Sequence, residues 1–318
     1  MRTPPRKILI DTDPGIDDAM AIFYALASPE LDVVGLTTVF GNAHTAVCTT
    51  NALKLLEIAD RTHIPVAKGV DAPLVMPYRG PVAFVHGTDG QGDVFLPPPA
   101  TKPEPIDAAQ FIIRTVMDSP GGITLVALGP LTNVAIAMLI EPALTTNLVG
   151  IVLMGGNAFC GGNASPAAEA NILNDPEAAD IVFGADCSIV MAGLDVTEKT
   201  FMSAADIAQF ATFGNARAKH LAAITPFYET FYRGRNGVDG IFVHDSSTIS
   251  YLLAPELYSW VEHPVRVDCG HSFCRGKTQT AARVSDHEAE WSTRRAVRIL
   301  TGVDSRAVVE LELERLRR

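Results

Sequence analysis

Four aspartates stand within eight residues near the start of the chain. They belong to the segment Asp11-Thr12-Asp13-Pro14-Gly15-Ile16-Asp17-Asp18, which directly follows the apolar run Ile8-Leu9-Ile10. The segment contains neither Cys nor His. Carboxylate oxygens are the ligands that Ca²⁺ and Mg²⁺ prefer, whereas Zn²⁺ favours nitrogen and sulfur. The segment therefore predicts a site for a hard divalent cation.

A simpler interpretation makes Asp17 the cap of a helix and leaves the other carboxylates in solvent. Acidic residues in a first helical turn are favoured by the helix dipole, which accounts for one or two of the aspartates. It does not account for four at one turn, because their repulsion raises their pKa values unless a cation is bound. We therefore favour the metal site.

Short β-rich runs alternate with helical stretches around this segment. The pattern predicts strands at 8–10, 33–39, 64–66, 123–127, 148–153 and 188–191, and helices at 17–27, 46–59, 108–117 and 131–139. It also predicts a small C-terminal β element from 265–267, 278–282 and 296–300. Such alternation is typical of an α/β protein with an open, doubly wound, mostly parallel sheet and helices on both faces. Ligands bind beyond the carboxyl ends of such strands, where the acidic segment falls.

Two long segments interrupt this alternation. Residues 68–105 are rich in Pro and Gly, and residues 155–175 are rich in Gly, Asn and Ala. Long loops in a compact domain are often functional. The composition does not shift sharply anywhere, so we expect a single domain over residues 1–318.

The acidic segment closely resembles the N-terminal signature of the inosine–uridine-preferring nucleoside hydrolases. Further motifs resemble that family in the same order, from roughly residue 7 to residue 283. They are Thr37-Thr38-Val39-Phe40-Gly41-Asn42, His86-Gly87-Thr88-Asp89-Gly90, Gly129-Pro130-Leu131-Thr132-Asn133, Met154-Gly155-Gly156, the set Asn163, Glu169 and Asn171, His244-Asp245, and Arg275-Gly276-Lys277-Thr278. An ordered set of this kind is far more specific than any one of its members.

The resemblance implies a Rossmann-like fold and a Ca²⁺-dependent reaction. Water would hydrolyse the N-glycosidic bond of a ribonucleoside and release ribose and a free nucleobase, in purine or pyrimidine salvage. The metal ligands would be Asp13, Asp18, Asp245 and the carbonyl oxygen of Leu128. Asp13 would also be the general base, and His244 the general acid for the departing base.

The same resemblance implies six substrate-binding residues. Asp17 and Asn42 would bind ribose hydroxyls near the metal, His86 would close over the substrate, and the other side of the ribose would contact Asn163, Glu169 and Asn171. The spacing of the last three indicates an extended loop. Their residue types are also those of an ordinary loop, so a purely structural role stays open from the residues themselves.

Four further residues bear on base specificity. Tyr228 and Tyr232 have helical spacing, which fits either the helix core or a base pocket. Ala170 stands where members of the family often carry Phe, and Ser246 follows His244-Asp245 where Pro is frequent. Neither departure removes a ligand or the expected acid.

Two other classes of protein share part of this sequence pattern. A haloacid-dehalogenase-type Mg²⁺ phosphohydrolase also begins with a strand and Asp-x-Asp, but its second Asp is usually followed by Gly-Thr rather than Pro14-Gly15. A non-catalytic nucleoside-binding protein on the same fold is the other alternative, because fold does not fix function. The retained acidic residues and His244 argue against it.

Composition limits the partners and the location. The chain of 318 residues carries 25 Lys and Arg against 36 Asp and Glu, a net charge of −11, which disfavours nucleic acid as a partner. No apolar run is long enough for a membrane span or a secretory signal, and the five cysteines are odd in number and scattered. We expect a cytoplasmic enzyme acting on a small ribonucleoside. By resemblance it would be a homo-oligomer, a tetramer or a dimer.

Overall fold

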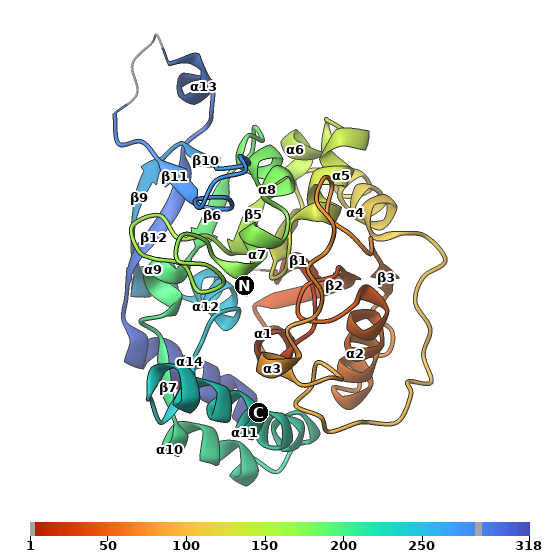
Figure 1. Ribbon diagram of the computed structural model, residues 1–318. Coiled ribbons are helices and arrows are strands. Elements are labelled where there is room, and N and C mark those ends of the chain that lie inside the picture. The colour runs from red at the N-terminus through yellow and green to blue at the C-terminus, as the bar shows by residue number, and fades with distance from the viewer. Residues whose placement is uncertain (1–3, 284–287) are drawn as a thin grey trace.

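An eight-stranded sheet forms the centre of the computed structural model, which describes residues 4–283 and 288–318 (Figure 1). Its strand order is β3-β2-β1-β4-β5-β6-β12-β9. In that order the strands are Val66–Lys68, Leu31–Thr38, Arg6–Thr12, Ile123–Ala127, Leu148–Met154, Ile189–Ala192, Val297–Val303 and Tyr258–His263. All neighbours run parallel except β9, which is antiparallel to β12. The expected mostly parallel sheet is thus confirmed.

Helices cover both faces of the sheet, because successive residues of a strand point to opposite sides. Ile8 and Ile10 of β1 face one core, and Leu9 faces the other. The first core is closed by α1 (Ile16–Leu26), α2 (Thr45–Ile58), α11 (Ala216–Asn236), α12 (Ser246–Leu253) and α14 (Ser305–Arg317). The second is closed by α4 (Ala108–Met117), α5 (Thr132–Ile140), α6 (Leu144–Asn147) and α8 (Pro176–Phe183).

Short elements complete the fold outside these layers. The helical ones are α3 (Ala83–His86), α7 (Ala170–Asn174), α9 (Leu194–Thr197), α10 (Ala204–Ile207), η1 (Ala208–Thr212), η2 (Pro255–Leu257) and α13 (Ala289–Ser292). Two antiparallel pairs join β7 (Phe201–Ser203) to β8 (Gly240–Phe242) and β10 (Val265–Val267) to β11 (Thr278–Thr280). The two long irregular segments therefore contain one short helix each, α3 and α7.

The expected C-terminal β element is wrong in one part. Residues 265–267 and 278–280 do pair with each other, but 296–300 does not join them. That run forms most of β12, which enters the main sheet between β6 and β9. Its apolar residues Val297, Ile299 and Leu300 are buried in the two cores, which explains why it belongs to the central sheet.

No helix in the described ranges is long and apolar enough to cross a membrane. The five cysteines are free thiols, as their odd number and scattered positions suggested.

The carboxyl ends of three central strands lie in register. Thr12 at the end of β1 pairs with Thr38 of β2, and Asp11 pairs with Ala127 of β4. The chain therefore leaves these strands at one edge of the sheet, where Asp13, Asn42 and Leu128 follow. This alignment brings segments far apart in the sequence to one place.

Candidate active site

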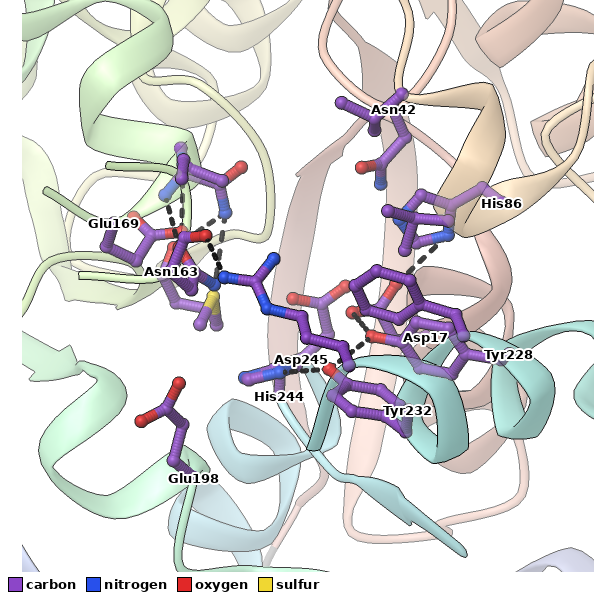
Figure 2. A pocket seen from close by; sticks show the side chains of 18 of the residues that line it. Asp17, Asn42, His86, Asn163, Glu169, Glu198, Tyr228, Tyr232, His244 and Asp245 are labelled. Atoms are coloured by element: carbon purple, nitrogen blue, oxygen red, sulfur yellow. Dashed lines mark hydrogen bonds and ion pairs between the residues drawn. The ribbon is translucent and has the colours of Figure 1, made fainter. Parts of the chain in front are cut away.

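A pocket opens at this edge of the sheet and is lined by residues from both halves of the chain (Figure 2). Of the eleven residues expected at the site, nine line it: Asp17, Asn42, His86, Leu128, Asn163, Glu169, Asn171, His244 and Asp245. Asp13 and Asp18 lie beneath this wall, fully or almost fully buried.

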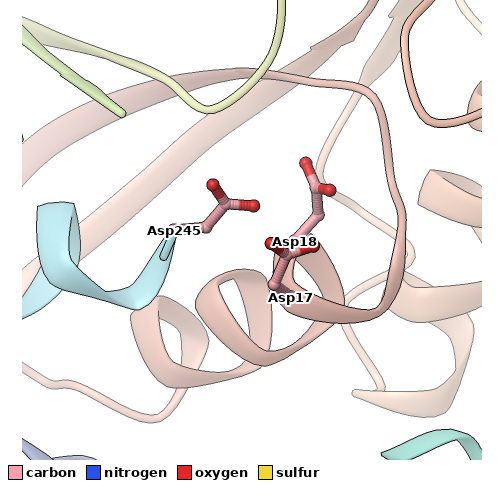
Figure 3. Close-up of side chains that lie close together, drawn as sticks. All are labelled: Asp17, Asp18 and Asp245. Carbon is pink, nitrogen blue, oxygen red and sulfur yellow. The ribbon is translucent and has the colours of Figure 1, made fainter. Parts of the chain in front are cut away.

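Three carboxylates converge at the floor of the pocket. Asp17 and Asp18 come from the first turn of α1, and Asp245 from the residue that precedes α12 (Figure 3). One oxygen of each lies within 4.8 Å of the others. Burial raises the pKa of all three, and carboxylate repulsion raises the pKa values of Asp18 and Asp245 further. A hard cation would relieve this repulsion, and the all-oxygen donor set fits one.

Asp13 lies beside this cluster, and one of its carboxylate oxygens makes no hydrogen bond within the described chain. Its Oδ2 accepts a hydrogen bond from the amide of Asn42 at 2.7 Å, while Oδ1 is buried and has no partner among the described residues. A Cβ on Gly129 would stand 2.4 Å from Oδ1, so only glycine leaves room there. Burial, and then the neighbouring Asp18 carboxylate, raise the pKa of Asp13 well above its usual range.

Asp18 is held by the turn that starts α1. Its Oδ2 accepts hydrogen bonds from the Gly15 amide at 2.9 Å and from Nδ2 of Asn42 at 2.9 Å, and its Oδ1 accepts one from Thr12 at 2.5 Å. Asp18, not Asp17, thus bonds back to the helix start, and the interpretation of Asp17 as a cap is wrong. The oxygen Oδ1 of Asp17 is itself buried without a partner in the described chain.

The opposite wall carries the expected sugar-binding trio. Asn171 donates from Nδ2 to the carbonyl of Leu128 at 2.6 Å, and Asn163 accepts from the amide of Ala170 at 3.0 Å. Glu169 precedes α7 and accepts three backbone N–H bonds. Burial raises the pKa of Glu169 to about 7 although these bonds lower it. The members of the trio thus shape the loop and also line the pocket, and their binding of the sugar stays a prediction.

His244 ends a chain of hydrogen bonds that crosses the pocket wall. Its Nε2 lies 2.7 Å from the hydroxyl of Tyr232, which lies 3.2 Å from the hydroxyl of Tyr228. Tyr228 in turn donates to Oδ2 of Asp17 at 3.1 Å. The other ring nitrogen of His244 lies 2.9 Å from Oγ1 of Thr197. The two tyrosines are thus both core residues and pocket residues (Figure 2).

His86 packs over the start of α1. Its Nδ1 accepts a hydrogen bond from the amide of Ile16 at 3.2 Å and lies 3.9 Å from Oδ1 of Asp17. Its ring stacks on Tyr228 at 5.5 Å between centroids. Burial lowers the pKa of His86 to about 4, so the ring is neutral near pH 7. A Cβ on Gly15 would stand 2.7 Å from Nδ1, which explains the glycine.

The loop that follows His86 is tied to the acidic turn. Gln91 donates from Nε2 to the carbonyl of Gly15 at 2.8 Å, and its Oε1 lies 2.9 Å from Nε2 of His220. Asn51 bridges the carbonyls of Pro14 and Asp89 at 3.2 and 2.9 Å. This loop, expected to close over the substrate, thus lies fixed beside the acidic turn in this structure.

Several pocket residues were missed by sequence reasoning. Glu198, Arg235, Phe231 and Phe84 line its outer part. The guanidinium of Arg235 donates to the carbonyl of Asn163 and lies 5.7 Å from the centroid of the Phe231 ring. Arg235 lies three residues after Tyr232 on α11, a spacing that could have pointed to the same helix face. No comparable signal marks Glu198.

Known proteins define the class to which this fold and site belong. The model of the inosine-uridine preferring nucleoside hydrolases matches residues 8–310. The chain belongs to this family, and it is a hydrolase that acts on N-glycosyl bonds. The match overrules both alternatives, the phosphohydrolase and the non-catalytic binding protein.

Individual relatives cover almost the whole chain. It is 43% identical to the probable uridine nucleosidase 2 of Arabidopsis thaliana, over 98% of this chain and 97% of that protein. It is 38% identical to the pyrimidine-specific ribonucleoside hydrolase RihA of Escherichia coli, over 98% of both. Among solved structures, a plant nucleoside hydrolase, the PpNRh1 enzyme, matches with a TM-score of 0.95 and 40% identity over 98% of this chain and 99% of that one. A purine-preferring ribonucleoside hydrolase from Gardnerella vaginalis matches with a TM-score of 0.91 and 31% identity over 98% of both.

Proposed function

We propose that this enzyme is a Ca²⁺-dependent ribonucleoside hydrolase that releases ribose and a free nucleobase for salvage. The observation that carries the proposal is the juxtaposition, at one pocket, of a buried carboxylate cluster and a histidine–tyrosine hydrogen-bond chain. The first suits a cation and the activation of water. The second suits protonation of a departing base.

Asp13, Asp18, Asp245 and the carbonyl oxygen of Leu128 would hold the cation. The support is chemical: these donors are all oxygens, and Oδ1 of Asp13 is buried without a partner among the described residues. We add Asp17 to these proposed ligands, because it falls within the 4.8 Å cluster, which does not include Asp13. A bound cation would lower the pKa of a water molecule at this floor.

Asp13 acts as the general base in this proposal. Its carboxylate accepts a proton from water, and the water oxygen bonds to C1′ of the ribose as the bond from C1′ to the base nitrogen breaks. The base leaves with the electron pair of the broken bond and receives a proton.

His244 supplies that proton. The donor is the protonated ring, which becomes a neutral imidazole as the base leaves. Burial lowers the pKa of His244, and the nearby Asp17 carboxylate raises it. We assign Tyr232 the role of holding the His244 ring and its proton. Tyr228 connects this pair to the carboxylate of Asp17.

Opposite walls of the pocket would grip the ribose. Asp17, Asn42 and His86 contribute from the side of β1 and β2, and Asn163, Glu169 and Asn171 from the loop after β5. Such two-sided binding holds C1′ over the carboxylate floor. Correct positioning of the reacting atoms is itself a large part of catalysis.

Pyrimidine nucleosides, uridine first, are the proposed preferred substrates. The names of the relatives at 38–43% identity support this preference. Arg235 and Glu198 offer a donor and an acceptor at the outer part of the pocket, which suits the carbonyls and the imide N–H of uracil. The test is to incubate the enzyme with uridine, cytidine, inosine and adenosine and to measure free base. Faster release of hypoxanthine than of uracil would overturn the preference.

Three further expectations stay proposals. The chain would act as a single domain, in the cytoplasm, and as a homodimer or homotetramer. Sedimentation equilibrium of the purified protein distinguishes a monomer from either assembly. A purely monomeric enzyme would contradict the expected assembly and leave the proposed reaction untouched.

A further inference from the structure

Ser246 makes a buried contact directly behind the carboxylate cluster. It follows Asp245 in the sequence and is the first residue of α12. Its hydroxyl donates to Oε1 of Glu312 at 2.6 Å, and both residues are buried, with exposed fractions of 1% and 0%. Ser246 and Glu312, which lies on α14, therefore form a pair 66 residues apart.

The buried position of Glu312 is unfavourable for a carboxylate. Its Oε2 is buried and has no partner in the described part of the chain, and burial raises its pKa to about 7. A buried oxygen without a hydrogen-bond partner destabilises the fold. The hydroxyl of Tyr24 on α1 is buried without a described partner too, and after burial itself the Glu312 carboxylate is the main cause that raises the pKa of Tyr24. Glu312 thus faces both α12 and α1.

The three helices at this point pack on one another in pairs (Figure 1). Two of them carry the carboxylate cluster at their starts, because Asp17 and Asp18 begin α1 and Asp245 precedes α12. The first turn of α12 has no side-chain cap. Its other side-chain hydrogen bonds, from Ser247 and Thr248, end on the carbonyls of Val243 and Asp245 in the same segment.

We propose that Glu312 is a positioning residue that, through Ser246, fixes the first turn of α12 and so the place of the Asp245 carboxylate relative to Asp17 and Asp18. The inference rests on the proposed cation-binding role of Asp245. Partners that orient metal ligands from behind affect metal affinity about 10- to 100-fold when removed. Ser246 and Glu312 touch neither substrate nor cation in this account.

The test compares Ser246→Ala, Glu312→Leu and Glu312→Gln with the wild-type enzyme. Glutamine keeps an oxygen that can accept the hydrogen bond from Ser246, so Glu312→Gln should retain the properties that Glu312→Leu loses. The control is Ser28→Ala, which removes another buried serine hydroxyl, one that donates to the carbonyl of Tyr24 at 2.8 Å, at the other end of α1. Two properties are measured: the Kd of the chelator-stripped protein for Ca²⁺ by calorimetry, and amide hydrogen exchange across residues 244–250.

Ser246→Ala and Glu312→Leu should each raise the Kd for Ca²⁺ about 10-fold or more and speed exchange in the first turn of α12. Glu312→Gln and Ser28→Ala should stay within about 3-fold of the wild type, a span of roughly 0.7 kcal/mol. If the first two variants keep both the Kd and the exchange of the wild type, the inference is wrong, even where their melting temperatures fall.

Amide hydrogen exchange tests the positioning role of Glu312 independently of Ca²⁺ binding. A wild-type protein that binds no Ca²⁺, but whose Ser246→Ala variant exchanges faster at residues 244–250, contradicts the cation assignment and supports the positioning role. Normal exchange in that variant overturns the positioning role whether or not Ca²⁺ binds.

Discussion

The hydroxyl of Tyr232 lies 2.7 Å from Nε2 of His244, and both side chains are buried in the wall of the pocket. The contact joins α11 to the segment that carries Asp245. It places the expected general acid in a hydrogen-bond chain that reaches Asp17 through Tyr228. Loss of either partner should therefore affect departure of the base more than binding of the sugar.

His244→Ala should lower kcat for uridine by about 100-fold or more, the usual worth of a general acid. It should slow p-nitrophenyl riboside much less, because that leaving group needs no proton. The measurement is the ratio of the two kcat values in variant and wild type. Equal slowing of both substrates would remove His244 from the role of acid.

Tyr232→Phe should act in the same direction but more weakly. Loss of this one hydrogen bond to His244 should raise the activation free energy by about 1.4 kcal/mol, which lowers kcat for uridine about 10-fold. Tyr251→Phe is the control, because that buried tyrosine accepts from Arg298 away from the pocket. If both variants slow uridine alike, the Tyr232 contact has no special part in the reaction.

Arg235→Ala should raise KM for uridine several-fold and leave kcat nearly unchanged, since the proposed contact of Arg235 with the base does not involve C1′. The matched control is Arg233→Ala, which removes the same charge from an exposed neighbour that pairs with Asp239. A fall in kcat with constant KM would instead place Arg235 in the chemical step.

Glu312 makes stability depend on pH in a defined direction. Its pKa is about 7 in the fold against 4.5 for the free side chain, so the folded protein holds more protons between these values. The free energy of unfolding should therefore be highest below about pH 4.5, as far as this group is concerned, and fall as pH rises through 7, by about 3 kcal/mol at most.

Glu312→Gln removes this dependence. Above pH 7 the variant should be more stable than the wild type, and the difference should vanish towards pH 4.5. Urea unfolding of both proteins across that range measures it. A difference that does not change with pH would show that Glu312 keeps an ordinary pKa in the fold.

Removal of Ca²⁺ should lower both activity and stability. A cation at 100 times its Kd stabilises a folded protein by about 2.7 kcal/mol. Scanning calorimetry of chelator-stripped protein should show a lower Tm that Ca²⁺ restores in a concentration-dependent way. A Tm indifferent to Ca²⁺ would contradict the proposed site.

The sequence predicted the parts of the fold that rest on local pattern. Apolar strands followed by amphipathic helices placed β1, β2, β4 and β5 within a few residues of their observed bounds. It predicted a strand at 296–300, within β12, but gave that strand the wrong partners, because its pairing with β6 and β9 is long-range and leaves no local pattern. The residues of β9 likewise do not indicate that it pairs antiparallel with β12 at the edge of the sheet.

In the candidate site, too, local contacts could be predicted from the sequence and long-range contacts could not. Asp17 and Asp18 stand in one motif, so their proximity follows from local sequence. The contact of Tyr232 with His244 and that of Ser246 with Glu312 join separate helices, and no spacing predicts them. Glu198 reaches the pocket only through the position of α9, which the sequence leaves open.

Release of free ribose from uridine tests the central claim most directly. The wild-type enzyme with Ca²⁺ should release ribose and uracil in equal amounts. The Asp13→Ala variant should be slower by at least about 1,000-fold, because it loses both a proposed ligand and the general base. Absence of ribose with the wild type, or equal rates for the two proteins, would contradict the account.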